Sequence, residues 1–243
     1  MSTQGRAAPT GDIVIVTGAS RGVGRATVLS LVQRHGRTVL AISRDGAALE
    51  SLKQASEDGP GRVEVVVQDV GAVDAAERIK AAVAGRRVLA LVHNAGLLHY
   101  RPMGEHVRED LLRLFTVNVL APLELTQALV TSLAGDPPGH VVHIGSMGGF
   151  QDSAKFPGLV AYSSSKAALA CMAQCLAEEF KDLGIRSNCL ALGSVDTQML
   201  REAFPGYVAQ VGAKEMGEFV AEFALEGHKL FNGKVLPLAL STP

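Results

Sequence analysis

Two residues four positions apart, Tyr162 and Lys166 in the segment YSSSK, have the types and spacing best suited to chemistry. If this segment is helical, their side chains project from one face about one turn apart. A phenol with a pKa of about 10 exchanges protons poorly at neutral pH, and a neighbouring ammonium group favours its ionised form. The spacing therefore predicts a proton-transferring pair. The alternative for Tyr162 is an aromatic core residue at the start of a helix.

A glycine-rich segment near the N-terminus, TGASRGVG at 17–24, follows an apolar run and leads into a helical pattern. Glycines at such a junction allow a tight turn and let a phosphate group approach the backbone. Free N–H groups at the start of the following helix favour an anion such as a pyrophosphate. A tight connection without a ligand is the alternative. The expected nucleotide-binding residues are Gly18, Ser20, Arg21, Gly22, Val23 and Gly24.

The residues after the second apolar run predict which dinucleotide binds. An acidic residue roughly 20 positions after the glycine loop would hold the ribose 2′-hydroxyl of NAD. Here Ser43 occupies that position, and Arg44 follows it. A guanidinium group pairs with a 2′-phosphate, and Arg21 offers a second cation, unless both arginines are merely solvated surface charges. We therefore expect NADP(H) to be preferred. NAD(H) stays open, because a shift of one residue would put Asp45 at the ribose.

A regular alternation of apolar runs and helical stretches must position these residues. Runs rich in Val, Ile and Leu are typical of strands buried on both faces of a sheet. Their alternation with helices predicts an α/β, Rossmann-type, doubly wound fold, with a seven-stranded parallel sheet flanked by helices on both faces of a single domain. The expected strands are 12–17, 38–42, 62–67, 88–93, 140–146, 185–191 and 234–240, and the expected helices are 22–35, 47–57, 73–84, 105–133, 160–183 and 213–226.

The composition argues against several classes of function. The chain has 243 residues and a formal net charge of -1, so neither nucleic acid nor an anionic membrane is an expected partner. No apolar run approaches the ~20 residues that span a bilayer. The cysteines and histidines lack disulfide or metal-ligand spacing, so we expect no metal and a reducing, cytoplasmic location. Cys171 and Cys175, four positions apart, are expected to share a packed helix face.

Together with the HNAG motif at 93–96, Asn118 within TVNVL, and Ser146, the segments TGASRGVG and YSSSK resemble the short-chain dehydrogenase/reductase family. The resemblance covers about residues 12–240, after an expected flexible tail at 1–11, and makes 12–243 one domain. It implies an NADP(H)-dependent oxidoreductase that transfers a hydride between nicotinamide and the carbonyl or alcohol carbon of a small organic substrate. It also implies a homodimer or homotetramer built on the two long helices.

The resemblance assigns catalytic roles to four residues. Tyr162 would be the general acid in reduction and the base in oxidation, and Lys166 would lower its pKa and bind the nicotinamide ribose. Ser146 would hold the substrate oxygen, and Asn118 would anchor a water that connects Lys166 to solvent. Each has a structural alternative, since Ser146 could cap backbone groups at a strand end and Asn118 could be a buried amide.

Further cofactor contacts are implied at the ends of later strands. Asp69 resembles the acidic residue that contacts the adenine amino group, with Val70 beside it. The loop formed by Asn94, Ala95 and Gly96 would border the adenine ribose.

After the sixth strand, Val195 and Thr197 match family positions that bind the carboxamide and the pyrophosphate. Leu192 replaces the family's usual proline, so the chain loses a fixed φ there. Residues 194–212 would form a short substrate lid, with packing onto the sheet as the alternative. The apolar and aromatic side chains of this segment are Met199, Leu200, Phe204, Pro205 and Tyr207.

The main alternative function is a non-catalytic, NADP(H)-sensing regulatory protein on the same fold. The set of Asn118, Ser146, Tyr162 and Lys166 favours the enzyme, because a sensor would not need it. An epimerase or dehydratase with tightly held NAD resembles longer chains. The substrate stays open, since thioesters, pteridines, steroids and sugars are all compatible with the sequence.

Overall fold

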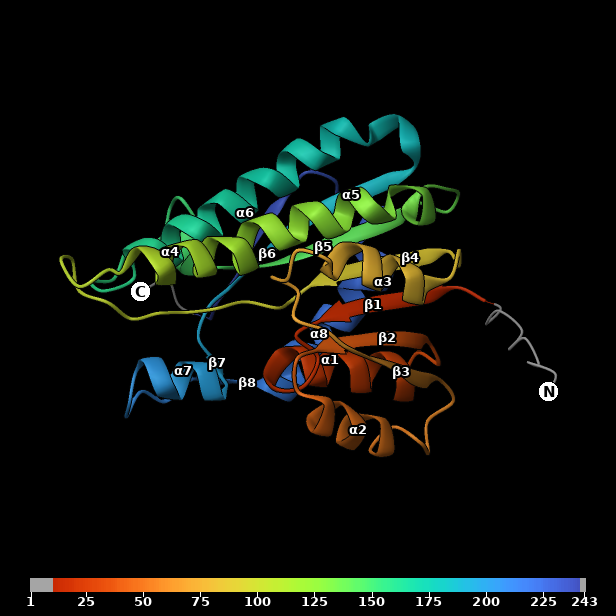
Figure 1. Cartoon of the computed structure of the whole chain (residues 1–243), viewed down its shortest axis with the longest axis horizontal. Helices are drawn as coiled ribbons and strands as arrows, with labels where there is room; N and C mark the ends of the chain where they lie inside the picture. Colours follow the sequence, from red (N-terminus) through yellow and green to blue (C-terminus); the bar gives the residue numbers. More distant parts are fainter. Residues whose placement is uncertain (1–10, 241–243) are drawn as a thin grey trace.

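The computed structural model describes residues 11–240 and shows a parallel sheet of seven strands (Figure 1). The strand order is β3-β2-β1-β4-β5-β6-β9. Chain order reverses direction between β1 and β4, which places the crossover helices on both faces. The expected doubly wound, single-domain α/β fold is confirmed. The strands are β1 (Ile13–Thr17), β2 (Thr38–Ser43), β3 (Arg62–Val67), β4 (Val88–His93), β5 (Gly139–Ser146), β6 (Ile185–Leu192) and β9 (Val235–Leu238).

The helices begin and end close to the expected positions, with one exception that matters for the site. Residues 105–133, expected as one helix, form α4, a π-helical turn over Thr116–Leu120, and α5. Pro122 has no N–H, so the α-type hydrogen bond to the carbonyl of Asn118 cannot form. The α-helices are α1 (Gly22–Gln33), α2 (Gly46–Gln54), α3 (Ala75–Val83), α4 (Arg108–Phe115), α5 (Ala121–Leu133), α6 (Val160–Glu179), α7 (Gln198–Ala203) and α8 (Ala213–Glu226).

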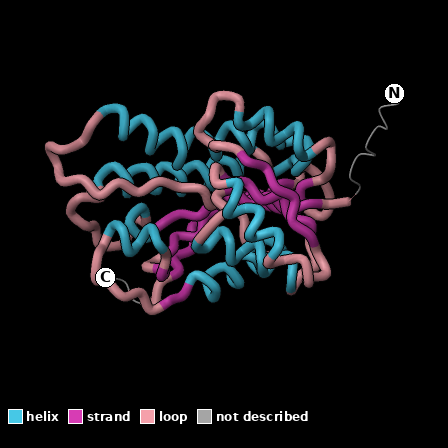
Figure 2. Tube along the Cα trace, turned by 60° about the horizontal axis from the view of Figure 1, so that its bottom comes forward, coloured by secondary structure: helices cyan, strands magenta, loops and turns pink. Residues whose placement is uncertain are grey.

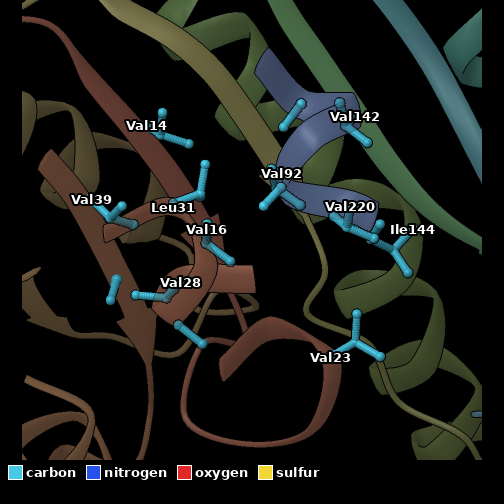
Figure 3. Packing of buried hydrophobic residues seen from close by; sticks show 14 of the residues in the cluster. Val14, Val16, Val23, Val28, Leu31, Val39, Val92, Val142, Ile144 and Val220 are labelled. Atoms are coloured by element: carbon cyan, nitrogen blue, oxygen red, sulfur yellow. The ribbon is translucent and has the colours of Figure 1, made fainter. Parts of the chain in front are cut away.

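Alternate residues of β1 contribute to two apolar cores, one on each face of the sheet. Val14 and Val16 pack in the core beneath α1 and α8, where Figure 3 shows them near Val220. Ile13 and Ile15 belong to the second core, which α3, α5 and α6 cover. Figure 2 shows the strands enclosed between these two helical layers. Burial on both faces explains why the strands have no polar alternation.

The face of α6 that carries Cys171 and Cys175 differs from expectation. Both thiols are exposed, so the prediction of a packed face was wrong. Small residues occupy both faces of α6, and the buried ones are Ala161, Ser165, Ala173 and Ala177. Alanine and cysteine differ little in size and polarity, so the sequence of this helix does not show which face packs.

The segment after β6 contains short elements that the apolar pattern did not predict. β7 (Val195–Asp196) pairs in parallel with β8 (Val211–Gly212), and α7 lies between them in the chain. Figure 1 shows α7 and β7 beyond one end of the main sheet. Thr197 caps α7 by accepting a hydrogen bond from the Leu200 N–H. Elements this short carry too few residues to show a period.

The helical stretch Arg108–Leu133 is long and apolar enough to span a membrane by length and composition alone. Leu114, Leu125, Leu129 and Leu133 are buried within the protein, as in the core helix of a globular domain. Residues 1–10 of the expected N-terminal tail lie outside the described part of the chain, and Gly11 is exposed.

Candidate active site

A cavity of about 490 Å³ opens where the carboxyl ends of the parallel strands meet. In a doubly wound sheet, ligands bind at this edge, next to the point where strand order reverses. The cavity is lined by the segments that follow six of the strands. Of the residues expected from sequence to bind cofactor or catalyse, all line it except Gly24 and Asn118. Those that line it are Gly18, Ser20, Arg21, Gly22, Val23, Ser43, Arg44, Asp69, Val70, Asn94, Ala95, Gly96, Ser146, Tyr162, Lys166, Val195 and Thr197.

The glycine turn is held against the loop after β4. A Cβ at Gly18, whose φ is +66°, would lie 2.8 Å from the Cα of Ala95. A Cβ at Gly24 would lie 2.3 Å from Nδ2 of Asn94. That amide donates to the carbonyls of Thr17 and Gly18 at 2.9 and 3.1 Å. Gly24 therefore lets the first turn of α1 pack against Asn94 of the loop after β4, and Asn94 fixes the shape of the glycine turn.

The start of α1 faces the cavity with its backbone donors free. Arg21 precedes the helix in an extended conformation, no side chain caps the first turn, and no acidic residue lies in it. Unpaired N–H groups at a helix start attract anions. The guanidinium of Arg21 donates to Oε1 of Gln198 at 3.0 Å, so this loop also contacts α7.

The segment after β2 shows where Asp45, the alternative candidate for contact with the ribose, lies. Asp45 accepts the Ala48 N–H at 3.0 Å as the N-cap of α2, and it does not line the cavity. Ser43 lines it instead, and its hydroxyl donates to the hydroxyl of Ser20 at 2.9 Å. Arg44 also lines it, with a side chain that is 60% exposed. The register shift that would favour NAD(H) is absent from this structure.

Arg113 of α4, which the sequence analysis did not predict, lines the cavity beside the predicted Asp69. Its guanidinium donates to Oδ2 of Asp69, and Nη1 of Arg44 lies 3.9 Å from the same oxygen. Burial opposes ionisation of Asp69, but the Gly71 N–H and the Arg113 guanidinium outweigh it, so the pKa of Asp69 is lowered. Arg113 is 44 positions from Asp69 in the chain. No local sequence pattern predicts a contact of that range.

Tyr162 enters the cavity from the first turns of α6, opposite Ser146 at the end of β5. The Ser146 hydroxyl accepts the Gly148 N–H at 3.1 Å, which holds the turn after β5. Burial raises the pKa of Tyr162, and Ser146 opposes that shift only in part. This direction is opposite to the lowering expected from Lys166, whose Nζ lies 6.0 Å from the ring centre. The phenol is therefore protonated at neutral pH.

Lys166 is the buried ammonium group of the site. Its Nζ donates to the carbonyl of Ile144 at 2.8 Å, and its side chain is almost completely buried. Burial lowers its pKa to about 8. A Cβ at Gly96 would lie 3.3 Å from Nζ, so a larger residue there would crowd the ammonium group.

Asn118 lies behind the cavity wall, in the π-helical turn, and is fully buried. Its amide donates to the Leu97 carbonyl and to the Ser165 hydroxyl, both at 2.9 Å, and its Oδ1 accepts the Leu97 N–H at 2.8 Å. The side chain is thus committed to protein partners, as the structural alternative anticipated. The backbone carbonyl of Asn118 lacks its α-helical donor because residue 122 is proline.

His93, His140 and His143 are buried in strands of the sheet, and no histidine of the described chain lines the cavity. His93 and His143 stack with ring centres 5.1 Å apart, and burial lowers the pKa of His93 to about 3. Within residues 11–240, no cluster of three or more histidine, cysteine or acidic side chains could hold a metal ion.

Comparison with known proteins places the chain in a family. A family model described as short chain dehydrogenase matches residues 12–207. Carbonyl reductase (NADPH) 2 of Sus scrofa is 34% identical over 77% of this chain and 73% of its own. An NADPH-dependent aldehyde reductase-like protein, chloroplastic, of Arabidopsis thaliana is 28% identical over 94% of this chain and 93% of its own.

Solved structures give the same result. A protein from Beutenbergia cavernae, described as an NAD(P)-dependent gluconate 5-dehydrogenase and solved with bound NADP, superimposes with a TM-score of 0.82. It is 28% identical and is covered over 95% of its length, against 94% of this chain. The fold and the residues around the cavity define an α/β oxidoreductase. The chain belongs to the short-chain dehydrogenase/reductase family.

Proposed function

We propose that this oxidoreductase uses NADP(H) to transfer a hydride between nicotinamide and the carbonyl or alcohol carbon of a small organic molecule. One observation carries the proposal: Ser146, Tyr162 and Lys166 line the same cavity as the glycine turn and the open start of α1. The names of the reductases from Sus scrofa and Arabidopsis thaliana, which both specify NADPH, support it.

The residues at the cavity suit a dinucleotide. The unpaired N–H groups of the first turn of α1 would hold the pyrophosphate, and Thr197 reaches the same place, since a Cβ at Gly22 would lie 3.3 Å from its Cγ2. Arg44 and Arg21 would face the 2′-phosphate, with Ser43 between them and the sheet. Asp69 would face the adenine, with its charge balanced by Arg113.

The catalytic side chains divide the proton chemistry among them. The nicotinamide, when bound, exchanges a hydride with the substrate carbon. Tyr162, kept protonated by burial, would donate its proton to a carbonyl oxygen in reduction and accept one in oxidation. Ser146 would hold that oxygen and stabilise charge that develops on it. Lys166, charged below a pH of about 8, would stabilise the phenolate that remains.

After Tyr162 has given up its proton, a new proton would reach it from solvent through a water and Lys166. The Asn118 side chain is bound to Leu97 and Ser165, so a water would be anchored by the Asn118 backbone carbonyl rather than by its amide. The role implied by the resemblance, that of a water anchor, is kept but passes to the main chain of Asn118. Its side chain positions the turn, and the main chain would carry the relay.

The remaining features of the proposal concern the rest of the domain. Residues 12–243 would act as one unit, with 194–212 as the substrate lid. Exposed Leu120, Leu123 and Val160 on the long helices support a homo-oligomer formed through them. Free thiols on α6 suit a reducing, cytoplasmic compartment.

The test combines cofactor binding with turnover. NADPH should raise the melting temperature more than NADH does at equal concentration. NADPH absorbance should fall when a panel of aldehydes and ketones is added. A larger stabilisation by NADH would overturn the cofactor assignment. Binding of NADPH without turnover of any carbonyl compound would contradict the oxidoreductase proposal for this substrate class.

A further inference from the structure

The charged side chains of the cavity belong to one half of the sheet. Arg21, Arg44 and Asp69 follow β1, β2 and β3, and Arg113 reaches Asp69 from α4. The strand order places β3, β2 and β1 together on one side of β4. Among residues 11–240, the one other charged residue of the lining is Lys166, which donates to the carbonyl of Ile144.

The other half, which follows β5 and β6, contributes apolar side chains to the wall. No charged residue of this half, Lys166 apart, lines the cavity within the described chain. Its polar groups beyond the catalytic pair already have partners: the Ser194 hydroxyl bonds to the Tyr207 hydroxyl at 3.0 Å, and Gln198 bonds to Arg21 and Glu202. The apolar lining residues here are Met147, Phe156, Leu159, Leu192, Met199, Leu200 and Phe204.

The charged residues of the lid and of the loop before α6 do not line the cavity. Arg201 and Asp196 form an ion pair, and both side chains are more than half exposed. Lys155, in the loop before α6, donates to the carbonyl of Phe150 and to the Ser153 hydroxyl at 3.0 Å. None of these residues lines the cavity.

Aromatic side chains border the apolar half. Tyr100 meets Phe204 edge to face with ring centres 6.0 Å apart. A Cβ at Gly158 would lie 2.6 Å from the Tyr100 ring, so the loop before α6 packs directly on it. Three segments that are distant in sequence therefore close over the same apolar space.

We propose that the substrate is an uncharged carbonyl compound with an apolar aliphatic or aromatic body, and not a sugar acid or a polyhydroxylated ketone. The inference rests on the proposed function, because it concerns the molecule that Tyr162 protonates. A carboxylate in this half would lose its hydration without gaining a cation, and the several hydroxyls of a sugar would find only Ser194, Tyr207 and Gln198, which are already bonded. An apolar body gains from leaving water.

Matched ketones test the proposal with the purified protein and saturating NADPH. 2-Octanone, methyl 7-oxooctanoate and 7-oxooctanoate share one reacting group and one chain, and only the last carries a charge. The kcat/KM of the two neutral ketones should exceed that of the carboxylate by about 10²-fold or more, and fructose should react no better than the carboxylate. Equal or faster turnover of the carboxylate or of fructose would overturn the proposal.

A substitution in the wall sharpens the test. Leu200→Arg places a cation in the apolar half, so the ratio of kcat/KM between carboxylate and ester should rise at least tenfold. Leu230→Arg makes the same change at a side chain that is 84% exposed and does not line the cavity, and it should leave the ratio unchanged. Equal ratios in the two variants would show that this half does not contact the substrate, which overturns the proposal.

Binding separates a failure of this inference from a failure of the proposed function. The melting temperature of the NADPH-bound Tyr162→Phe protein can be measured with each compound. Stabilisation by the neutral ketones alone, without turnover in the parent protein, would support the substrate class and reject the reaction. Stabilisation by the carboxylate that equals or exceeds that by the ester would overturn the substrate class.

Discussion

The two halves of the cavity are built in different ways. The half after β1, β2 and β3 is a set of short turns fixed by hydrogen bonds and ion pairs, such as Asn94 to Gly18 and Arg113 to Asp69. The half after β5 and β6 is a longer, apolar segment held by packing, with Tyr100 against Phe204. A fixed polar half suits a constant ligand, whereas an apolar half can change its substrate by exchange of a few side chains.

The largest effect should come from the residue where the two halves meet. Tyr162→Phe removes the proton carrier, so kcat should fall by about 10³-fold, while the Kd for NADPH changes less than twofold. Steady-state kinetics and fluorescence titration measure the two quantities. Tyr100→Phe, which removes a hydroxyl from a half-exposed side chain that does not line the cavity, serves as the control and should retain most of the activity. Comparable turnover in Tyr162→Phe would contradict the assignment.

A smaller effect is expected at the polar half. Arg44→Asp replaces a cation that would face the 2′-phosphate by a carboxylate that repels it, so the ratio of kcat/KM for NADPH over NADH should fall by about 10²-fold. Arg108→Asp changes an exposed arginine at the start of α4 that does not line the cavity, and it should leave the ratio unchanged. An unaltered ratio in Arg44→Asp would leave the 2′-phosphate contact without support.

The pH dependence of reduction should report Lys166. Its pKa of about 8 is lowered by burial, so its ammonium is charged below this pH and neutral above it. The raised pKa of Tyr162 keeps the phenol protonated over the same range. We therefore expect kcat/KM for ketone reduction to be level below pH 8 and to fall up to tenfold per pH unit above it. A profile that stays level to pH 10 would show that the free enzyme does not need this charge.

The smallest effect is expected at Arg113. Its substitution should show whether this residue only balances the charge of Asp69 or contacts the nucleotide directly. Arg113→Leu leaves the charge of Asp69 balanced only by the more distant Arg44, whose Nη1 lies 3.9 Å away. Because Arg44 is the cation proposed for the 2′-phosphate, the KM for NADPH should rise about fivefold and that for NADH less. Arg113→Lys keeps the charge and should recover most of the loss. An equal rise for both nucleotides would assign Arg113 to the adenine or to folding rather than to phosphate tolerance.

The sequence predicts the polar half far better than the apolar one. Ser43 ends β2, Arg44 follows it, and Asp69 comes two residues after β3, so locating the strands places them at the correct edge of the sheet. Arg113 was missed because its contact joins distant parts of the chain. The helix α7 was missed because its six residues have no measurable period.

Two further differences have local physical causes. The pKa of Tyr162 is raised rather than lowered, because burial of the phenol outweighs its hydrogen bond with Ser146, and the Lys166 ammonium stays 6.0 Å from the ring centre. The break of the helix expected at 105–133 depends on Pro122, which is tolerated in the first turn of α5. The sequence contains this proline, but an apolar period that continues on both sides conceals the break.

Because of the π-helical turn at Thr116–Leu120, the number of residues in this segment sets the rotation of α4 relative to α5. Each residue of an α-helix advances the chain by about 100°. A one-residue deletion that restored a regular helix would therefore rotate α4 against α5 by about that angle. Either Arg113 would turn away from Asp69, or Leu125 and Leu129 would turn out of the core. Insertions and deletions that surface loops tolerate would here disturb nucleotide binding and folding together.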